Sequence, residues 1–72
     1  MSMNKILRIY TYKGKISKKY YKIAYFARQF NFVHISKDKI KECNKCTGKD
    51  GRKYLEYNGE FSFDKEKQEI RI

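Results

Sequence analysis

Apolar and polar residues alternate near the start of the chain in a way that predicts a β-strand. The segment Asn4–Tyr12 is rich in β-branched and aromatic residues, which favour extended backbone. Because successive side chains of a strand point to opposite sides, Leu7 and Ile9 share one face. We expect that aliphatic face to pack on the core and the other face to expose Arg8 between tyrosines. A turn at Gly14 follows.

The next segment, Lys18–Phe30, follows a helical period. At about 100° per residue, its apolar side chains gather on one side and its cations and two tyrosines on the other. Ser17 can cap the first turn, and Asn31 can take the left-handed conformation that ends a helix. The alternative is a strand over 19–26 in a hairpin with the first strand, because aromatic residues favour strands. The separated faces and two alanines favour the helix.

Two shorter elements follow. The apolar run Phe32–Ile35 predicts a short strand. Ser36 can cap a second helix from Lys37 to about Cys43, with Asp38 in the first turn, where the helix dipole favours an anion. The residues from Cys43 to Gly51 are polar and contain glycines, so we expect a loop there.

The last third predicts a three-stranded β-meander. Tyr54–Tyr57 and Glu60–Phe63 flank Asn58-Gly59, which is the strongest short hairpin signal. A three-residue loop with a bulge at the glycine turns Phe61 toward the core. A further loop of four residues then sets Phe61 opposite Ile70.

These elements predict a single α+β domain over residues 1–72. One main helix packs on an antiparallel sheet that ends in the meander. A hydrophobic fraction of 40% is enough for a small core in a chain of 72 residues. No run approaches the roughly 18 apolar residues that span a bilayer, and charges arrive too early for a signal peptide. We therefore expect a cytoplasmic protein.

Charge is unevenly distributed. Residues 1–37 contain nine Lys or Arg and no Asp or Glu, whereas residues 38–72 contain nine Lys or Arg and eight Asp or Glu, so 9 − 8 = +1. Five of the seven tyrosines lie in the basic half. Cations beside flat rings are typical of surfaces that neutralise phosphates and stack on bases.

The polar face of the predicted helix is the expected centre of such a contact. An ordinary solvated helix mixes charges of both signs, whereas this one carries no acid. The alternative is an ordinary lysine-rich, solvated surface that binds no ligand. The nucleic-acid-binding candidates are Lys18, Tyr21, Lys22, Tyr25 and Arg28 at the centre, with Arg8, Tyr10, Tyr12 and Lys13 beside them.

Cys43 and Cys46 have the spacing of half a zinc ribbon. A structural zinc site needs four ligands, and the chain offers no second cysteine pair, although His34 is a candidate third ligand. Two reduced thiols or a redox pair are the alternatives. We therefore expect no cofactor. Since no nucleophile–base pair or phosphate-cradling glycine loop is visible, we also expect no enzymatic activity.

The sequence thus predicts a small basic protein that binds DNA or RNA with low sequence selectivity. A different class of function fits the same residues. The bias toward Lys, Ile, Tyr and Asn, without Pro or Trp, is typical of AT-rich genomes, including those of phages and mobile elements. Small proteins of such elements inhibit host or defence-system proteins by direct binding, and Tyr and Arg are common at such interfaces.

Overall fold

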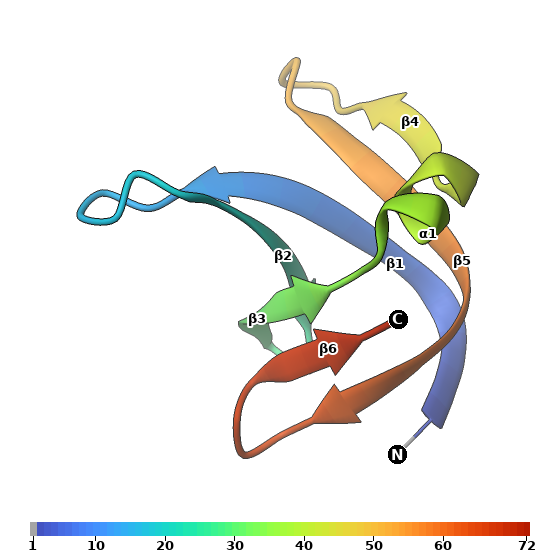
Figure 1. The fold of residues 1–72 in the computed structure, drawn as a ribbon. Helices are drawn as coiled ribbons and strands as arrows, with labels where there is room; N and C mark the ends of the chain where they lie inside the picture. Colours follow the sequence, from blue (N-terminus) through green and yellow to red (C-terminus); the bar gives the residue numbers. More distant parts are fainter. Residues whose placement is uncertain (1) are drawn as a thin grey trace.

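Five strands close into a barrel in the computed structural model of the chain, which describes residues 2–72 and the side chains from residue 6 onward (Figure 1). The order around the barrel is β1, β2, β3, β6, β5 and back to β1, and β4 extends the sheet beside β5. The β3–β6 pair is parallel and the others are antiparallel. The elements are β1 Ser2–Lys13, β2 Tyr20–Phe26, β3 Gln29–His34, α1 Lys37–Glu42, β4 Asn44–Thr47, β5 Lys53–Asp64 and β6 Glu69–Arg71.

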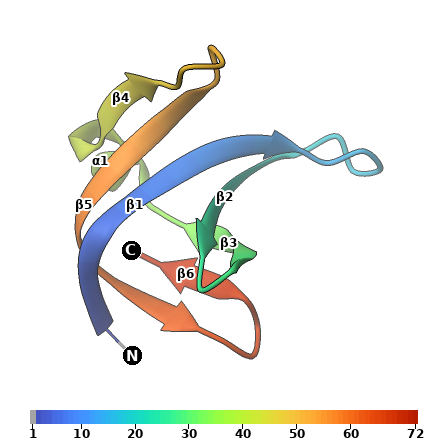
Figure 2. The ribbon, with the colours of Figure 1, turned by 180° about the vertical axis from the view of Figure 1, so that it is seen from behind.

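The two long strands, β1 and β5, change partners along their length and so curve around the barrel. β1 pairs with β5 from Ser2 to Ile9 and with β2 from Ile9 to Lys13. β5 pairs first with β4, then with β1 and finally with β6. Beyond the Ile9–Leu55 pair the two strands separate. The β1–β2 arm (residues 10–23) and the β4–β5 arm (residues 44–54) therefore diverge (Figures 1 and 2).

The core lies inside the barrel. Leu7 and Ile9 are buried, which confirms the face predicted for the first strand. The buried side chain of Asn31 donates from Nδ2 to the backbone carbonyls of Phe26 and Gln29, at 3.0 and 3.1 Å, and so holds the β2–β3 turn. The core residues are Leu7, Ile9, Ala24, Val33, Cys43, Tyr57, Phe61 and Ile70.

The helix predicted over Lys18–Phe30 is wrong. The predicted α+β fold class, which depends on that helix, is therefore wrong as well. The segment forms β2 and the start of β3, so the alternative strand interpretation describes it better. The backbone of β2 bonds to β1 on one side and to β3 on the other. Aromatic residues fit that pleated surface. Ala24 is a poor strand residue, but it pairs with Ile9 and Asn31 and is wholly buried, where a small side chain fits the narrow interior.

The capping residues predicted for that helix have other roles. Ser17 lies in the loop of the β1–β2 arm, where its Oγ lies 2.8 Å from the Tyr21 hydroxyl. Asn31 lies inside β3. The loop between the strands contains Gly14, whose N–H donates to the Lys19 carbonyl at 2.8 Å.

The short helix is confirmed as α1, with Ser36 as its N-cap. The Ser36 hydroxyl accepts from the Lys39 N–H at 3.3 Å, and Asp38 lies in the first turn. The polar loop predicted after Cys43 is wrong in part, because Asn44–Thr47 forms β4. β4 pairs with the start of β5, and such a pairing is not visible in the local sequence.

The meander predicted at Asn58-Gly59 is wrong. Both residues lie in the middle of the continuous strand β5 and pair with β1. A Cβ atom on Gly59 would lie 2.7 Å from the Tyr57 hydroxyl oxygen, so the glycine leaves room for that buried ring. Phe61 faces inward as predicted, but Ile70 pairs with Phe63 instead.

Candidate nucleic-acid interface

Strand alternation places a row of rings on the outer surface of β1, β2 and β3. The same strands direct Ile9, Ala24 and Val33 into the core, so their neighbours along each strand face outward. Cross-strand pairs bring Tyr10 opposite Ile23, and Ile23 opposite Phe32. We call this surface the aromatic face; it consists of Tyr10, Tyr12, Tyr21, Ile23, Tyr25, Phe30 and Phe32.

Four rings of the aromatic face, Tyr12, Tyr25, Phe30 and Phe32, are exposed, although some of them contact a neighbouring ring, and Tyr10 and Tyr21 are partly exposed. Tyr25 and Phe30 are paired across β2 and β3, and their centroids are 5.1 Å apart; the two residues are 58% and 61% exposed. Tyr21 and Phe32 lie edge to face at 5.6 Å, and Phe32 is 50% exposed. A soluble monomer rarely exposes contiguous large apolar side chains without a partner for them.

Two hollows without acidic lining residues cut into the aromatic face. One has a volume of about 400 Å³ and lies between Tyr12, Phe30 and Phe32, with Lys67 and Gln68 at its edge. The other, of about 480 Å³, extends past Tyr10 toward Arg52 and Lys53 at the β4–β5 arm. None of the residues that line these two hollows is acidic, whereas a further hollow of about 750 Å³ beside Tyr21 and Phe32 includes Glu69, which is opposite Phe32. A planar aromatic or heterocyclic group is the ligand that such walls favour.

Cations stand beside the rings at the edges of the face. The Arg8 guanidinium lies 5.2 Å from the centroid of Tyr54, whose ring is 5.5 Å from that of Tyr10. The Arg52 guanidinium lies 6.0 Å from the Tyr10 centroid. These positions provide positive charge within reach of a ligand that stacks on the rings.

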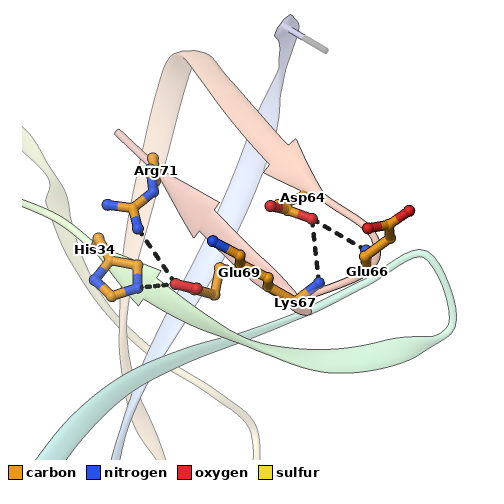
Figure 3. Close-up of polar contacts among 6 residues, drawn as sticks. All are labelled: His34, Asp64, Glu66, Lys67, Glu69 and Arg71. Atoms are coloured by element: carbon orange, nitrogen blue, oxygen red, sulfur yellow. Dashed lines mark hydrogen bonds and ion pairs between the residues drawn. The ribbon is translucent and has the colours of Figure 1, made fainter.

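The turn between β5 and β6 brings Lys67 to one edge of the face. Asp64 Oδ1 accepts from the backbone N–H groups of Glu66 and Lys67, each at 3.1 Å (Figure 3). Nearby, Glu69 Oε2 lies 2.6 Å from His34 Nε2 and accepts from Arg71 Nη2 at 3.4 Å (Figure 3). The Glu69 carboxylate is therefore engaged within the β3–β6 pair.

The nucleic-acid-binding candidates predicted from the sequence divide into two groups. The structure gathers the tyrosines at positions 10, 12, 21 and 25 on the aromatic face, with Arg8 at its edge. Lys18 and Arg28 lie in the turns before and after β2, and Lys13 lies at the end of β1. Lys22 points to the opposite side of the sheet, where its Nζ donates to Thr11 Oγ1 at 2.8 Å.

Several residues of the face were missed. Phe30 belongs to the apolar side of the predicted helix and Phe32 begins the predicted apolar strand, and neither is among the predicted binding residues, yet both are exposed. The signal that could have found them is the even spacing of Tyr10 and Tyr12, of Tyr21 and Tyr25, and of Phe30 and Phe32, which is the period of a strand. Tyr54, Arg52 and Lys67 come from distant segments, and only the closed barrel brings them near.

The two cysteines have different surroundings. Cys43 is buried and its Sγ–H donates to the Lys39 carbonyl at 3.2 Å, whereas Cys46 lies in β4 and is partly exposed. Burial raises the pKa of the Cys43 thiol, and the charge of Glu42 raises this pKa further. Within residues 2–72, no three His, Cys, Asp or Glu side chains are grouped to hold a metal ion. The third candidate, His34, contacts Glu69 instead.

Comparisons with known proteins found no match to this chain among protein-family models, curated proteins or solved structures. No helix within residues 2–72 is long and apolar enough to cross a membrane.

Proposed function

We propose that this protein binds single-stranded nucleic acid, with bases stacked on the aromatic face. The observation that carries the proposal is a set of exposed rings on one sheet surface whose strands contain no acid, since no Asp or Glu occurs before residue 38. Each base has a flat face that can stack on such a ring, and the adjacent cations neutralise the backbone. Recognition of this kind depends little on base identity, so we expect low sequence selectivity.

A single strand fits this surface better than a duplex. Bases inside a duplex are already stacked on each other, and only unpaired bases can be splayed onto side-chain rings. The rings spread over three adjacent strands, from Tyr12 and Tyr21 on the β1–β2 arm to Phe30 and Phe32 on β3, and this surface is broader than the helix or two-stranded ribbon that a major groove admits. Stacking on a sheet surface is a recurring mode of single-strand recognition.

The connectivity of the barrel adds support. A five-stranded Greek-key barrel with an exposed surface on its second and third strands resembles the OB-fold, whose corresponding surface binds oligonucleotides or oligosaccharides. A fold alone does not determine function. The net charge of +10 favours the polyanion over the neutral sugar.

Binding of labelled single-stranded DNA and RNA, measured by fluorescence anisotropy, tests the proposal. Tyr25→Ala and Phe30→Ala should each weaken binding by roughly 5- to 150-fold, which corresponds to about 1 to 3 kcal/mol per stacked base. Ile16→Ala is the control, because Ile16 is 97% exposed in the loop between β1 and β2 and lines none of the hollows. We expect that control to change affinity by less than about twofold.

Two outcomes would contradict the proposal. Equal affinity for duplex and single strand would show that the rings are not the contact. Undetectable binding to any nucleic acid at ~50 mM salt would instead favour the inhibitor of a host protein, with the aromatic face as the protein interface.

A further inference from the structure

A second concave site lies on the other side of the sheet, between the two arms. The arms separate beyond Ile9 and Leu55, and the space between them has a volume of about 430 Å³. It lies near the mouth of the barrel, with Ile40 of α1 on one wall. We call it the lysine cleft; it is lined by Ile9, Thr11, Lys22, Ile40, Lys45, Cys46, Thr47, Lys53, Tyr54 and Leu55.

Three lysines converge on this cleft from three different strands. Lys22 comes from β2, Lys45 from β4 and Lys53 from β5. Pairing explains the convergence, because Lys45 is opposite Leu55 and Lys53 is opposite Thr47, which places all of these side chains on the inward face of the β4–β5 arm. Hydroxyl groups accompany the ammonium groups, since Thr11 and Thr47 line the same cleft.

The charges of the cleft are not neutralised within the described part of the chain. None of its ten lining residues is acidic, and no ion pair found among residues 2–72 includes Lys22, Lys45 or Lys53. Lys22 is partly buried, and its Nζ is held by Thr11 Oγ1 at 2.8 Å. Like charges in one concavity repel each other and raise the local concentration of anions.

The lysine cleft and the aromatic face are continuous. Thr11 and Lys53 line both the cleft and the hollow beside Tyr10 and Tyr12. β1 has no β5 partner beyond Ile9, and ring and cation contacts of Tyr10 with Tyr54 and Arg52 connect the two arms there. A chain that leaves the rings can reach the cleft beside Thr11 and Lys53, which border both hollows.

We infer that the lysine cleft binds phosphate groups, and that these are phosphodiesters of the strand that stacks on the aromatic face. Ammonium and hydroxyl groups without a carboxylate suit phosphate oxygens. This inference depends on the proposed function for the source of the phosphates. It predicts a binding site longer than the aromatic face, with rings at one end and cations at the other.

The test compares a short oligonucleotide of about 4 nucleotides with one of about 12, which span the site sizes of small single-strand-binding barrels. The cleft variant carries Lys22→Gln, Lys45→Gln and Lys53→Gln. The control variant carries Lys37→Gln, Lys41→Gln and Lys65→Gln, which removes the same charge from residues that line neither the cleft nor the two hollows of the aromatic face. Thermal melts check that both variants fold.

For the longer strand, we expect the cleft variant to flatten the slope of log K against log salt by about two units, since each phosphate contact contributes about 0.7. The short strand should lose far less affinity, and the control variant should lose little with either strand. Equal losses of affinity in the cleft and control variants would overturn the inference, because the lower net charge of the protein would then explain the effect. Unchanged binding of the longer strand by the cleft variant would also overturn it.

A second probe separates the source of the phosphate from the existence of the site. Tripolyphosphate binding is measured by calorimetry with the unaltered protein and the cleft variant. Tripolyphosphate could bind to the unaltered protein but not to the cleft variant, while neither oligonucleotide binds. That result would support the phosphate site, but it would contradict the proposed function and the strand as the ligand of the site. If both oligonucleotides bind through Tyr25 and the cleft variant behaves as the control, the proposed function stands and the cleft inference fails.

Discussion

Two adjacent residues other than glycine, Ala27 and Arg28, have positive φ angles of 55° and 65° in the turn between β2 and β3. A two-residue hairpin turn of type I′ requires that conformation at both positions. A side chain makes it costly, by roughly 1 to 2 kcal/mol per residue. The buried amide of Asn31, which binds the carbonyls of Phe26 and Gln29, holds the turn against this cost.

Ala27→Gly should therefore stabilise the protein by about 0.5 to 1 kcal/mol, because glycine adopts positive φ without strain. In a helix the same substitution would destabilise by about 1 kcal/mol, so the sign of the change distinguishes the two structures. Urea unfolding measures this change in the free energy of unfolding. Ala24→Gly is the control, and it should destabilise by about 1 to 2 kcal/mol because the residue is fully buried inside a strand.

At the scale of elements, the features predicted correctly are those fixed by nearby residues. The buried side of β1 follows from alternation at Leu7 and Ile9, and α1 begins at a serine whose hydroxyl caps it. The features predicted wrongly are those that depend on pairing with distant segments. Asn58-Gly59 is a strong local hairpin signal, but β1 pairs along the whole region and keeps β5 extended.

The candidate site was partly predictable for a related reason. The absence of acids and the clustering of tyrosines are properties of the sequence, so they identify Tyr10, Tyr12, Tyr21 and Tyr25 as candidates even though the predicted fold is wrong. Their arrangement on one surface, with Tyr12 opposite Tyr21 on neighbouring strands, is a property of the sheet. Lys22 was placed on the face of a helix, and strand alternation sends it to the opposite side instead.

The two phenylalanines Phe30 and Phe61 distinguish the outer and inner surfaces of the sheet. Phe61 is 2% exposed, so Phe61→Ala should empty a core site and cost roughly 3 kcal/mol. Phe30 is 61% exposed, so Phe30→Ala should cost less than about 1 kcal/mol, mainly through the lost ring contact with Tyr25. Chemical denaturation of both variants checks this. Comparable losses would show that Phe30 belongs to the core.

At the scale of the whole molecule, the charge of +10 acts on folding and on binding in opposite directions. Lysines and arginines repel each other in the compact state, and salt screens that repulsion. Salt also competes with the protein for phosphates, because binding releases the counterions condensed on the strand. A protein stabilised by surface ion pairs would behave differently, since salt weakens such pairs.

Raising salt from ~50 to ~200 mM should therefore raise the melting temperature of the free protein by a few degrees, since about 1 kcal/mol corresponds to 4–8 °C in a domain of this size. The same change should weaken single-strand binding by about 60-fold if four to five phosphates are neutralised, for a slope near −3. Melts with and without a 12-nucleotide strand measure both effects together. The two melting temperatures should converge as salt rises, because the free protein gains stability while the complex loses its ligand. A stabilisation by the strand that persists at ~200 mM salt would show that stacking on the aromatic face, and not phosphate neutralisation, provides most of the affinity.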